Sequence, residues 1–477
     1  MRLLGLLLAM FSVTMLPPLF VSIGFADGEW PIFVQSFAII VFAGLLLWWP
    51  FRNARDELRL RDGFLVVAMF WIVLGSFGAA PLLLDRSTDL TLTDAVFESV
   101  SGLTTTGATV LSGLDSLPPS LLFYRQQLQW FGGLGIIVLA VAVLPMLGVG
   151  GMQLYRAETP GPMKDAKLTP KITQTAKALW YVYLGITIVC ALAYWIAGMS
   201  AFDAICHSFS TVAIGGFSTH DASLGYFDSV AIEAVATFFM LVAGVNFALH
   251  FMSWQSRDLR VYLSDPELRA YLKILAGTCA IVLIYLWSTG YYASPFEALT
   301  KGIFQVVSVA TTTGFTTATF DAWPGSLPTL LIFSSFIGGC AGSTAGGMKV
   351  VRWLLLYRQG VREIKRLVHP SAEIPVKLGD RAVPPRVVES VWGFFAIYVV
   401  VLGTLILILV GTGLDPSSAF AAVAATLNNL GPGLGEVANG FGSVSNVAKW
   451  ASICAMLLGR LEIFTILVLV TPMFWQR

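Results

Sequence analysis

Four short segments of the sequence look like copies of one another, and each lies between two long apolar stretches. In each copy a run of Thr, Asn or apolar residues leads to a glycine, namely Gly107, Gly216, Gly314 and Gly431. Repetition at this length in a mostly apolar chain is typical of proteins built from repeated structural units. We therefore expect one pore assembled from four units of a single polypeptide.

The composition indicates a membrane protein. Charged residues make up 12% of the chain and apolar residues 56%, and the mean hydropathy is +0.77. These values argue against a water-soluble globule and predict contact with membrane lipid. A spanning helix needs about 20 apolar residues, and ten stretches reach that length, at residues 3–25, 31–50, 64–84, 121–147, 178–198, 228–252, 272–290, 326–357, 388–411 and 446–473. We expect the first to be a span and not a cleaved signal peptide, because it is long and a second follows at once.

The positive charges are unevenly distributed. Of the 29 Lys and Arg residues, 22 fall in four connections, at 52–61, 156–177, 257–273 and 349–386. The positive-inside rule places these connections, and with them both termini, in the cytoplasm. The connections that carry the repeats then lie on the outer side. Topology alone explains the basic loops, so no nucleic-acid partner is expected.

The repeats divide the chain into five parts. Residues 1–63 form a two-helix preface, and the four units cover 64–170, 171–270, 271–385 and 386–477. In each unit we expect a helix, a re-entrant segment and a second helix. N-terminal helix signals predict that a short helix opens near Thr93-Asp94, Phe202-Asp203, Ser294-Pro295 and Asp415-Pro416. These helices are too short to span, and non-helical backbone at membrane depth must be buried in protein or line a cavity. The expected fold is thus an all-α polytopic protein with fourfold pseudosymmetry.

The segment after each short helix is the candidate ion site. Glycine tolerates the positive φ that lets successive carbonyl oxygens face one axis, where they can replace the water around an ion. Ion permeation is therefore the leading hypothesis, and ordinary turns at the membrane edge are the alternative. The register of the second copy stays open between Gly215 and Gly216. The predicted filter residues are Thr104, Thr105, Thr106, Gly107, Ala213, Ile214, Gly215, Gly216, Thr311, Thr312, Thr313, Gly314, Asn428, Asn429, Leu430 and Gly431.

Two further features fall inside apolar stretches. Residues 338–347 hold five glycines, each of which costs about 1 kcal/mol in a helix relative to alanine, so an unbroken helix is doubtful there. The alternative is tight helix packing through small residues spaced four apart. Arg460 lies near the centre of the last stretch, where a charge should face protein or water. On the short helices, Glu98 and His207 occupy equivalent places and are expected to anchor the helix behind the filter more than to bind ions.

The ordered set of motifs resembles the Trk/Ktr/HKT superfamily of potassium transporters over nearly the whole chain. The matching features are the two leading helices and the sequences TTTGA at 104–108, AIGGFS at 213–218, TTTGFT at 311–316 and NNLGPG at 428–433. The resemblance implies a potassium filter in a multi-pass protein of the bacterial cytoplasmic (inner) membrane, with potassium bound at the filter residues only. In plant relatives a serine at the first filter glycine accompanies sodium permeation, so Gly107 favours potassium.

The resemblance also implies a gate and partners. It assigns the glycine-rich stretch to an intramembrane loop under the filter and puts Arg460 in the pore wall beside it, although a purely structural arginine remains the alternative. It further implies a homodimer and a cytoplasmic TrkA-like regulatory ring that binds a nucleotide (ATP, ADP or NAD). The gate residues implied in this way are Gly338, Gly339, Gly342, Ser343, Thr344, Gly346, Gly347 and Arg460.

No covalent cofactor is expected. The five cysteines form no C-x-x-C and the four histidines are scattered, which argues against a disulfide framework or a metal site. A potassium/proton or potassium/sodium symporter is the second hypothesis, but it needs an ionisable group at midplane, and few are available beyond Arg460 and Glu462. An enzyme is disfavoured, because the outer connections lack a nucleophile with a base.

Overall fold

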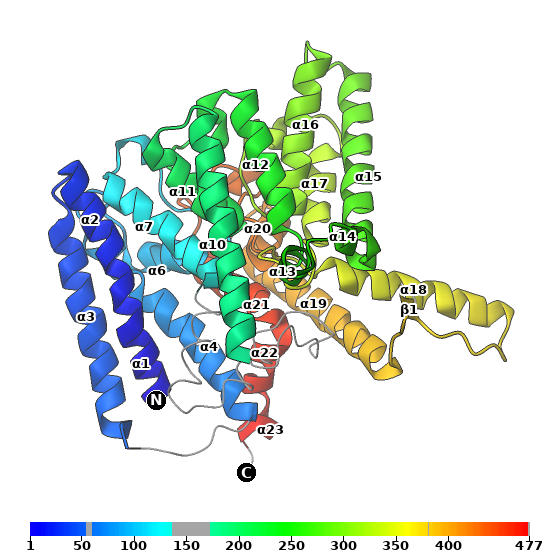
Figure 1. Ribbon diagram of the computed structural model, residues 1–477, viewed down its shortest axis with the longest axis horizontal. Coiled ribbons are helices and arrows are strands. Elements are labelled where there is room, and N and C mark those ends of the chain that lie inside the picture. The colour runs from blue at the N-terminus through cyan, green and yellow to red at the C-terminus, as the bar shows by residue number, and fades with distance from the viewer. Residues whose placement is uncertain (54–59, 136–171, 380, 476–477) are drawn as a thin grey trace.

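The computed structural model describes residues 1–53, 60–135, 172–379 and 381–475, and within them the chain is almost entirely helical (Figure 1). It begins with the expected two-helix preface. One arm runs through α1 (Arg2–Phe11), η1 (Ser12–Met15) and α2 (Leu16–Phe25), and the other through α3 (Trp30–Trp48) and η2 (Trp49–Phe51). The arms meet at glycines, since a Cβ added at Gly5 would lie 2.6 Å from the Gly44 carbonyl oxygen. Small residues thus permit the close helix contact.

Four units follow, each with a long helix, a short helix and a second helical segment after the short helix. The first contains α4 (Leu60–Phe77), α5 (Ala80–Leu84), α6 (Leu92–Leu103), η3 (Leu114–Ser116), α7 (Pro119–Trp130) and a π-helical turn, η4 (Phe131–Gly135). The second contains α10 (Ile172–Ile196), α11 (Ala201–Val212), η6 (Ser223–Phe227), α12 (Val230–Ala243), α13 (Phe247–Ser256) and α14 (Arg260–Ser264).

The third unit contains α15 (Pro266–Thr289), α16 (Pro295–Ala310), η7 (Phe320–Ala322), α17 (Leu327–Ser335), α18 (Val350–Val368) and the antiparallel pair β1 (Lys377–Leu378) and β2 (Arg381–Ala382). The fourth contains α19 (Pro385–Gly411), α20 (Pro416–Leu427), η8 (Gly435–Val437), α21 (Asn446–Arg460), α22 (Glu462–Val470) and α23 (Pro472–Trp475). The predicted boundary at 270/271 falls inside α15, because the Asp265-Pro266 helix start precedes it.

The four short helices α6, α11, α16 and α20 begin close to the predicted points. In α16 and α20 the caps are the predicted Ser294 and Asp415, each followed by proline. In α6 and α11 the helix begins earlier than expected. There Thr91 and Ser200 are the caps, and they accept hydrogen bonds from the N–H groups of Asp94 (3.3 Å) and Asp203 (3.0 Å). The two aspartates are therefore third-position partners of a capping box and not the caps themselves.

The second helix is interrupted in the second, third and fourth units. In the described residues six helices are long and apolar enough to cross a membrane, and two further pairs are bent, α12 with α13 by 90° and α21 with α22 by 113°. In the third unit the segment between α17 and α18 is not helical. In the first unit α7 continues into a π-helical turn at the end of the described residues. Such irregularities have local causes, and glycines lie at the second-unit and third-unit breaks and in the π-helical turn.

The interior unites the repeats. The largest buried apolar cluster contains Phe97, Val309 and Ala424, which come from the short helices of three different units. The remaining short helix, α11 of the second unit, belongs to another buried cluster, which contains its Val212 together with Phe304 of α16. At the periphery, α18 and its β-pair extend away from the rest of the molecule, and the start of α1 lies at the same end as α23 (Figure 1).

Candidate functional site

The four predicted filter segments share one backbone conformation. Each short helix ends in a Schellman motif, in which two N–H groups past the helix bond back to its last carbonyls. In the first unit Thr105 N–H donates to Gly102 O (3.0 Å) and Thr106 N–H to Ser101 O (2.9 Å), and the same pair recurs in every unit. In this motif the first of the two donor residues adopts the left-handed conformation. These residues are Thr105 (φ 55°), Ile214 (53°), Thr312 (67°) and Asn429 (54°). Glycine usually occupies this position, so these φ values are uncommon.

Two residues further on, each segment returns to positive φ at its glycine. The values are 80° at Gly107, 76° at Gly216, 87° at Gly314 and 97° at Gly431. By this geometry Gly216, and not Gly215, is the counterpart of the other three glycines. Unusual backbone that recurs four times is over-determined by its surroundings, as happens at ligand sites.

The four glycines form a closed ring of contacts between consecutive units. A Cβ added at Gly107 would lie 2.0 Å from the carbonyl oxygen of Gly215, one at Gly216 2.1 Å from that of Thr313, one at Gly314 2.1 Å from that of Leu430, and one at Gly431 2.7 Å from that of Thr106. The order runs from unit one to two, three, four and back to one. Each oxygen belongs to the residue just before the next glycine. Close approach as well as φ therefore requires glycine at all four positions.

Side chains support the ring from behind. Gln129 of α7 donates from Nε2 to Gly215 O (2.6 Å) and accepts from Phe217 N–H (3.0 Å), so it holds both sides of Gly216. Asn429 donates to the Thr106 hydroxyl (2.9 Å), which joins the fourth segment to the first. Asn428 donates to the Ser335 hydroxyl of α17 (2.9 Å). These bonds fix the segments relative to one another.

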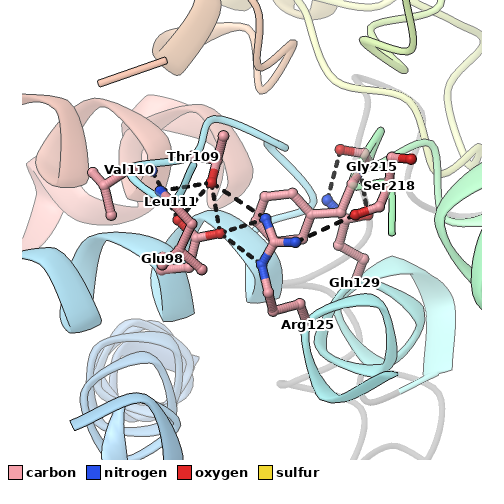
Figure 2. Close-up of polar contacts among 9 residues, drawn as sticks. Glu98, Thr109, Val110, Leu111, Arg125, Gln129, Gly215 and Ser218 are labelled. Atoms are coloured by element: carbon pink, nitrogen blue, oxygen red, sulfur yellow. Dashed lines mark hydrogen bonds and ion pairs between the residues drawn. The ribbon is translucent and has the colours of Figure 1, made fainter. Parts of the chain in front are cut away.

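A buried ion pair anchors the first segment (Figure 2). Arg125 of α7 and Glu98 of α6 are 1% and 0% exposed, and Arg125 donates to Glu98 Oε1 from Nη2 (2.6 Å) and Nε (2.9 Å). The carboxylate also accepts from the Thr109 hydroxyl (2.9 Å) and Val110 N–H (2.9 Å), which lie on the extended segment directly after Gly107. Arg125 reaches Ser218 O of the second unit (3.3 Å) and stacks its guanidinium 4.3 Å from the Phe217 ring centroid. All members are partnered, as a buried charge requires.

In the next two units the equivalent residues also hydrogen-bond the segment after the filter glycine, but they are not an ion pair. His207 of α11 contacts the Ser218 hydroxyl through Nε2 (2.9 Å), and Gln305 of α16 accepts from Thr317 N–H (3.3 Å). The fourth unit has Ala422 at this place. Glu98 and His207 are thus helix anchors, as expected from the sequence.

Further polar ties join neighbouring units at their outer ends. Glu233 of α12 pairs with Lys301 of α16 (2.5 Å), and Lys449 of α21 pairs with Asp94 of α6 (2.7 Å). Between the first two units His220 Nδ1 lies 2.5 Å from Asp115 Oδ1, and this hydrogen bond lowers the pKa of Asp115. Besides the ring of contacts around the glycines, these polar contacts join the first unit to the second, the second to the third and the fourth to the first.

The glycine-rich stretch is a loop that lies against the filter segments. Helix α17 ends at Ser335 and α18 begins at Val350, so the alternative of a continuous packed helix is wrong. Thr344 Oγ1 donates to Val212 O (2.9 Å), Gly346 N–H to Thr312 Oγ1 (2.7 Å) and Gly347 N–H to Asn428 O (3.0 Å). Positive φ at Gly338, Gly342 and Gly347 permits this path. The structure thus brings the predicted gate residues 338–347 together with the third and fourth filter segments and with the end of α11, the short helix that leads into the second segment.

Arg460 reaches the same loop from the fourth unit. It is the last residue of α21, beyond which Leu461 and Glu462 (φ 55°) turn the chain, so it stands at a helix end and not at the middle of a straight span. Its guanidinium donates to Thr344 O (3.2 Å), Gly133 O (2.7 Å) and Gly132 O (2.5 Å). A positive charge is favoured at a helix C-terminus. Glu462, at the start of α22, pairs with Arg352 of α18 (2.7 Å).

Three residues that support the site, Arg125, Gln129 and Lys349, were not predicted from the sequence. Arg125 and Gln129 lie on one of the ten apolar stretches, and a charge in such a stretch is the signal that could have marked Arg125 as Arg460 was marked. Lys349, which donates to Ala345 O of the loop, is 7% exposed and was counted only among basic residues of a connection.

Four pseudosymmetric units with re-entrant segments define a class of membrane transport protein, and comparison with known proteins agrees. A family model described as TrkH, cation transport protein, matches residues 30–477, and the chain belongs to this family. Proteins named Trk system potassium uptake protein TrkH are 57% identical in Halomonas elongata, over 100% of this chain and 99% of the relative, and 57% identical in Escherichia coli K12, with the same coverage. The TrkG protein of E. coli K12 is 42% identical over 99% of this chain and 97% of the relative.

The fold has a solved counterpart. The crystal structure of the potassium transporter TrkH from Vibrio parahaemolyticus superposes with a TM-score of 0.91 at 56% identity, and covers 100% of this chain and 98% of that one. This confirms the predicted family and the all-helical polytopic fold. The protein is a multi-pass membrane protein of a transport family, and not an enzyme.

Proposed function

We propose that this protein takes up potassium across the bacterial cytoplasmic membrane and that the main-chain oxygens of residues 104–107, 213–216, 311–314 and 428–431 are its selectivity filter. The ring of glycines, each against a carbonyl oxygen of the next unit, is the observation that carries the proposal. A ring of backbone carbonyls can replace the hydration shell of a potassium ion. The names of the relatives, potassium uptake proteins at up to 58% identity, support the choice of ion.

Helix electrostatics favour a cation at this ring. Each filter segment continues directly from the carboxyl end of a short helix, at Leu103, Val212, Ala310 and Leu427. A helix carries about half a negative charge at that end. Four such ends gathered around one ring attract a cation without placing a carboxylate in its path.

The direct test is ion flux into vesicles that contain the purified protein. We expect uptake of potassium down its gradient with strong preference over sodium. Equal uptake of both ions would reject the filter. Potassium uptake that stops when an inward proton or sodium gradient is removed would favour the alternative symporter.

We further propose that the loop 338–347 is the gate and that Arg460 holds it. The loop lies against filter residues Thr312 and Asn428, and Arg460 donates to its Thr344 carbonyl. A loop in this position can obstruct ions that have left the filter without contributing to the choice between them.

Deleting residues 342–347 is expected to raise potassium flux several-fold and to leave the potassium-to-sodium ratio unchanged. The deletion removes the bonds of Thr344, Gly346 and Gly347 to the filter segments, but no filter residue. Flux per inserted molecule in vesicles measures the effect. If the rate stays at its original value, the loop is packing and not a gate.

Arg460→Ala is also expected to raise potassium flux. At roughly 5 Å and an effective dielectric of about 20, two unit charges interact by about 3 kcal/mol, which is large compared with RT. The variant removes this repulsion together with the bond to Thr344. Flux per folded molecule is the measurement, and Arg460→Lys, which keeps the charge but loses the fork of donors, separates charge from anchoring. A fall in flux per folded molecule would assign Arg460 to the scaffold.

Orientation and partners complete the proposal. The basic connections are proposed to be cytoplasmic, with both termini, because 22 of 29 Lys and Arg lie in them. The described part of those connections has little folded structure of its own beyond α14, α18 and the β-pair. Ligand sensing is therefore assigned to a separate cytoplasmic TrkA-like ring that binds ATP, ADP or NAD, and the transporter itself is proposed to be a homodimer.

A further inference from the structure

Glu267 binds one residue inside the glycine-rich loop and one just beyond it in α18, although it lies far away in the sequence. It is the second residue of α15, and one carboxylate oxygen, Oε1, accepts from Ala341 N–H (2.7 Å) and from Val351 N–H (3.1 Å). The two donor N–H groups lie ten positions apart along the chain, on either side of the residues that touch the filter segments. The carboxylate therefore closes the base of the loop.

The chemistry makes this a strong contact. Glu267 is 9% exposed, so its side-chain oxygen accepts both hydrogen bonds in a largely buried place, where the loss of an acceptor leaves N–H groups unsatisfied at a cost of about 1–3 kcal/mol each. Val351 is the second residue of α18, so the carboxylate also sits at the positive end of that helix. By contrast, each residue in the middle of the loop is held by one such hydrogen bond. Thr344 donates to Val212 O at the end of α11, Gly346 to Thr312 and Gly347 to Asn428.

The start of α15, which carries Glu267, lies next to the β-pair of the basic connection 349–386. Its neighbour Pro266 lies beside Gly379, the turn between β1 and β2, since a Cβ added at Gly379 would be 3.6 Å from Pro266 Cγ. Arg358 of α18 donates to Lys377 O of β1. The turn of the β-pair at Gly379 thus lies next to the first turn of α15, and that turn carries the carboxyl group that holds the loop.

We propose that Glu267 is a positioning residue of the gate: by binding Ala341 and Val351 together it keeps the loop against the filter, and movement of the α15 start by the adjoining β-pair releases it. The inference rests on the proposed function, because it gives the loop a role in potassium flux. In this proposal the loop is held from two directions. Glu267 of the third unit holds it on the side that faces away from the filter segments, and Arg460 of the fourth unit holds it at Thr344.

The native Cys340 reports on the loop directly. Cys340 precedes Ala341, is 1% exposed and donates its N–H to Gly244 O (2.9 Å). In Glu267→Ala we expect the rate of Cys340 alkylation by a water-soluble maleimide, followed by peptide mass spectrometry, to rise about tenfold or more, because the two hydrogen bonds that hold Ala341 and Val351 together are lost. Potassium flux should rise several-fold at an unchanged potassium-to-sodium ratio. In Glu267→Gln, whose amide oxygen still accepts, both changes should be smaller.

The matched control is Glu297→Ala, which removes an exposed carboxylate from the first turn of α16. If Glu267→Ala leaves Cys340 as protected and flux as slow as the control does, the positioning role is overturned. If Cys340 becomes reactive while even the unaltered protein passes no potassium, the proposed function fails and the positioning role stands. Should Glu267→Ala not insert, the Glu267→Gln comparison decides, and no change from wild type in either readout rejects the proposal.

Discussion

Serine at Gly107 or Gly314 is expected to lower the preference for potassium over sodium by at least about tenfold, a change of 1.4 kcal/mol in relative ion binding. The added Cβ would lie 2.0 or 2.1 Å from a carbonyl oxygen of the next unit, so that oxygen must move out of the ring. Both positions also have positive φ, which costs a non-glycine residue on the order of 1–3 kcal/mol. The measurement is the ratio of potassium to sodium flux per inserted molecule.

The ring geometry also predicts a gradation. At Gly431 the corresponding distance is 2.7 Å, so alanine there should disturb selectivity less than alanine at Gly107, Gly216 or Gly314. Gly403→Ser in α19 is the control, because a Cβ at Gly403 has nothing within 4 Å. Unchanged ion ratios in both Gly107→Ser and Gly314→Ser would remove the filter assignment.

Arg125→Met is expected to destabilise the protein by about 3–5 kcal/mol, the usual result of leaving one member of a buried ion pair without its partner. Glu98 is fully buried and would keep only its bonds from Thr109 and Val110. Thermal unfolding in detergent and the yield of monodisperse protein measure the loss. Because α6 leads into the first filter segment, the surviving protein should also lose ion selectivity.

Two comparisons make this prediction specific. Arg362→Ala removes an arginine that pairs with the half-exposed Glu363 on α18, and such surface changes usually stay within about 0.5 kcal/mol. The double variant Glu98→Gln with Arg125→Met removes both charges and should recover part of the lost stability. Equal stability of Arg125→Met and Arg362→Ala would show that the ion pair is dispensable.

Features written in local sequence could be predicted. The apolar stretches gave the long helices, because burying a helix in lipid depends on roughly 20 consecutive residues and on no distant partner. Ser294-Pro295 and Asp415-Pro416 gave helix starts, because capping involves only neighbouring groups. The first two starts were placed too late, since Asp94 and Asp203 also favour a first turn when they are capping-box partners.

Contacts between units were beyond reach of the sequence. No local pattern shows that Gln129 binds Gly215, that Glu98 faces Arg125, or that Glu267 joins Ala341 to Val351. The ten apolar stretches likewise do not reveal that the second helix is broken in the second, third and fourth units, because apolar composition continues through each break. Arg460 shows both sides: its charge marked it as unusual, but its carbonyl partners come from the first and third units.

The sequence by itself determined the membrane class, the four repeats and the glycines on which each repeat ends, because spanning length, helix capping and tolerance of positive φ are properties of a few adjacent residues. Only the tertiary structure decided that Gly216 is the second-unit counterpart, that the repeats close in the order one to four, and that the loop 338–347 rests between filter and Glu267. Those facts depend on carbonyls and N–H groups from different units meeting within hydrogen-bond or van der Waals distance, and sequence separation carries no information about such meetings.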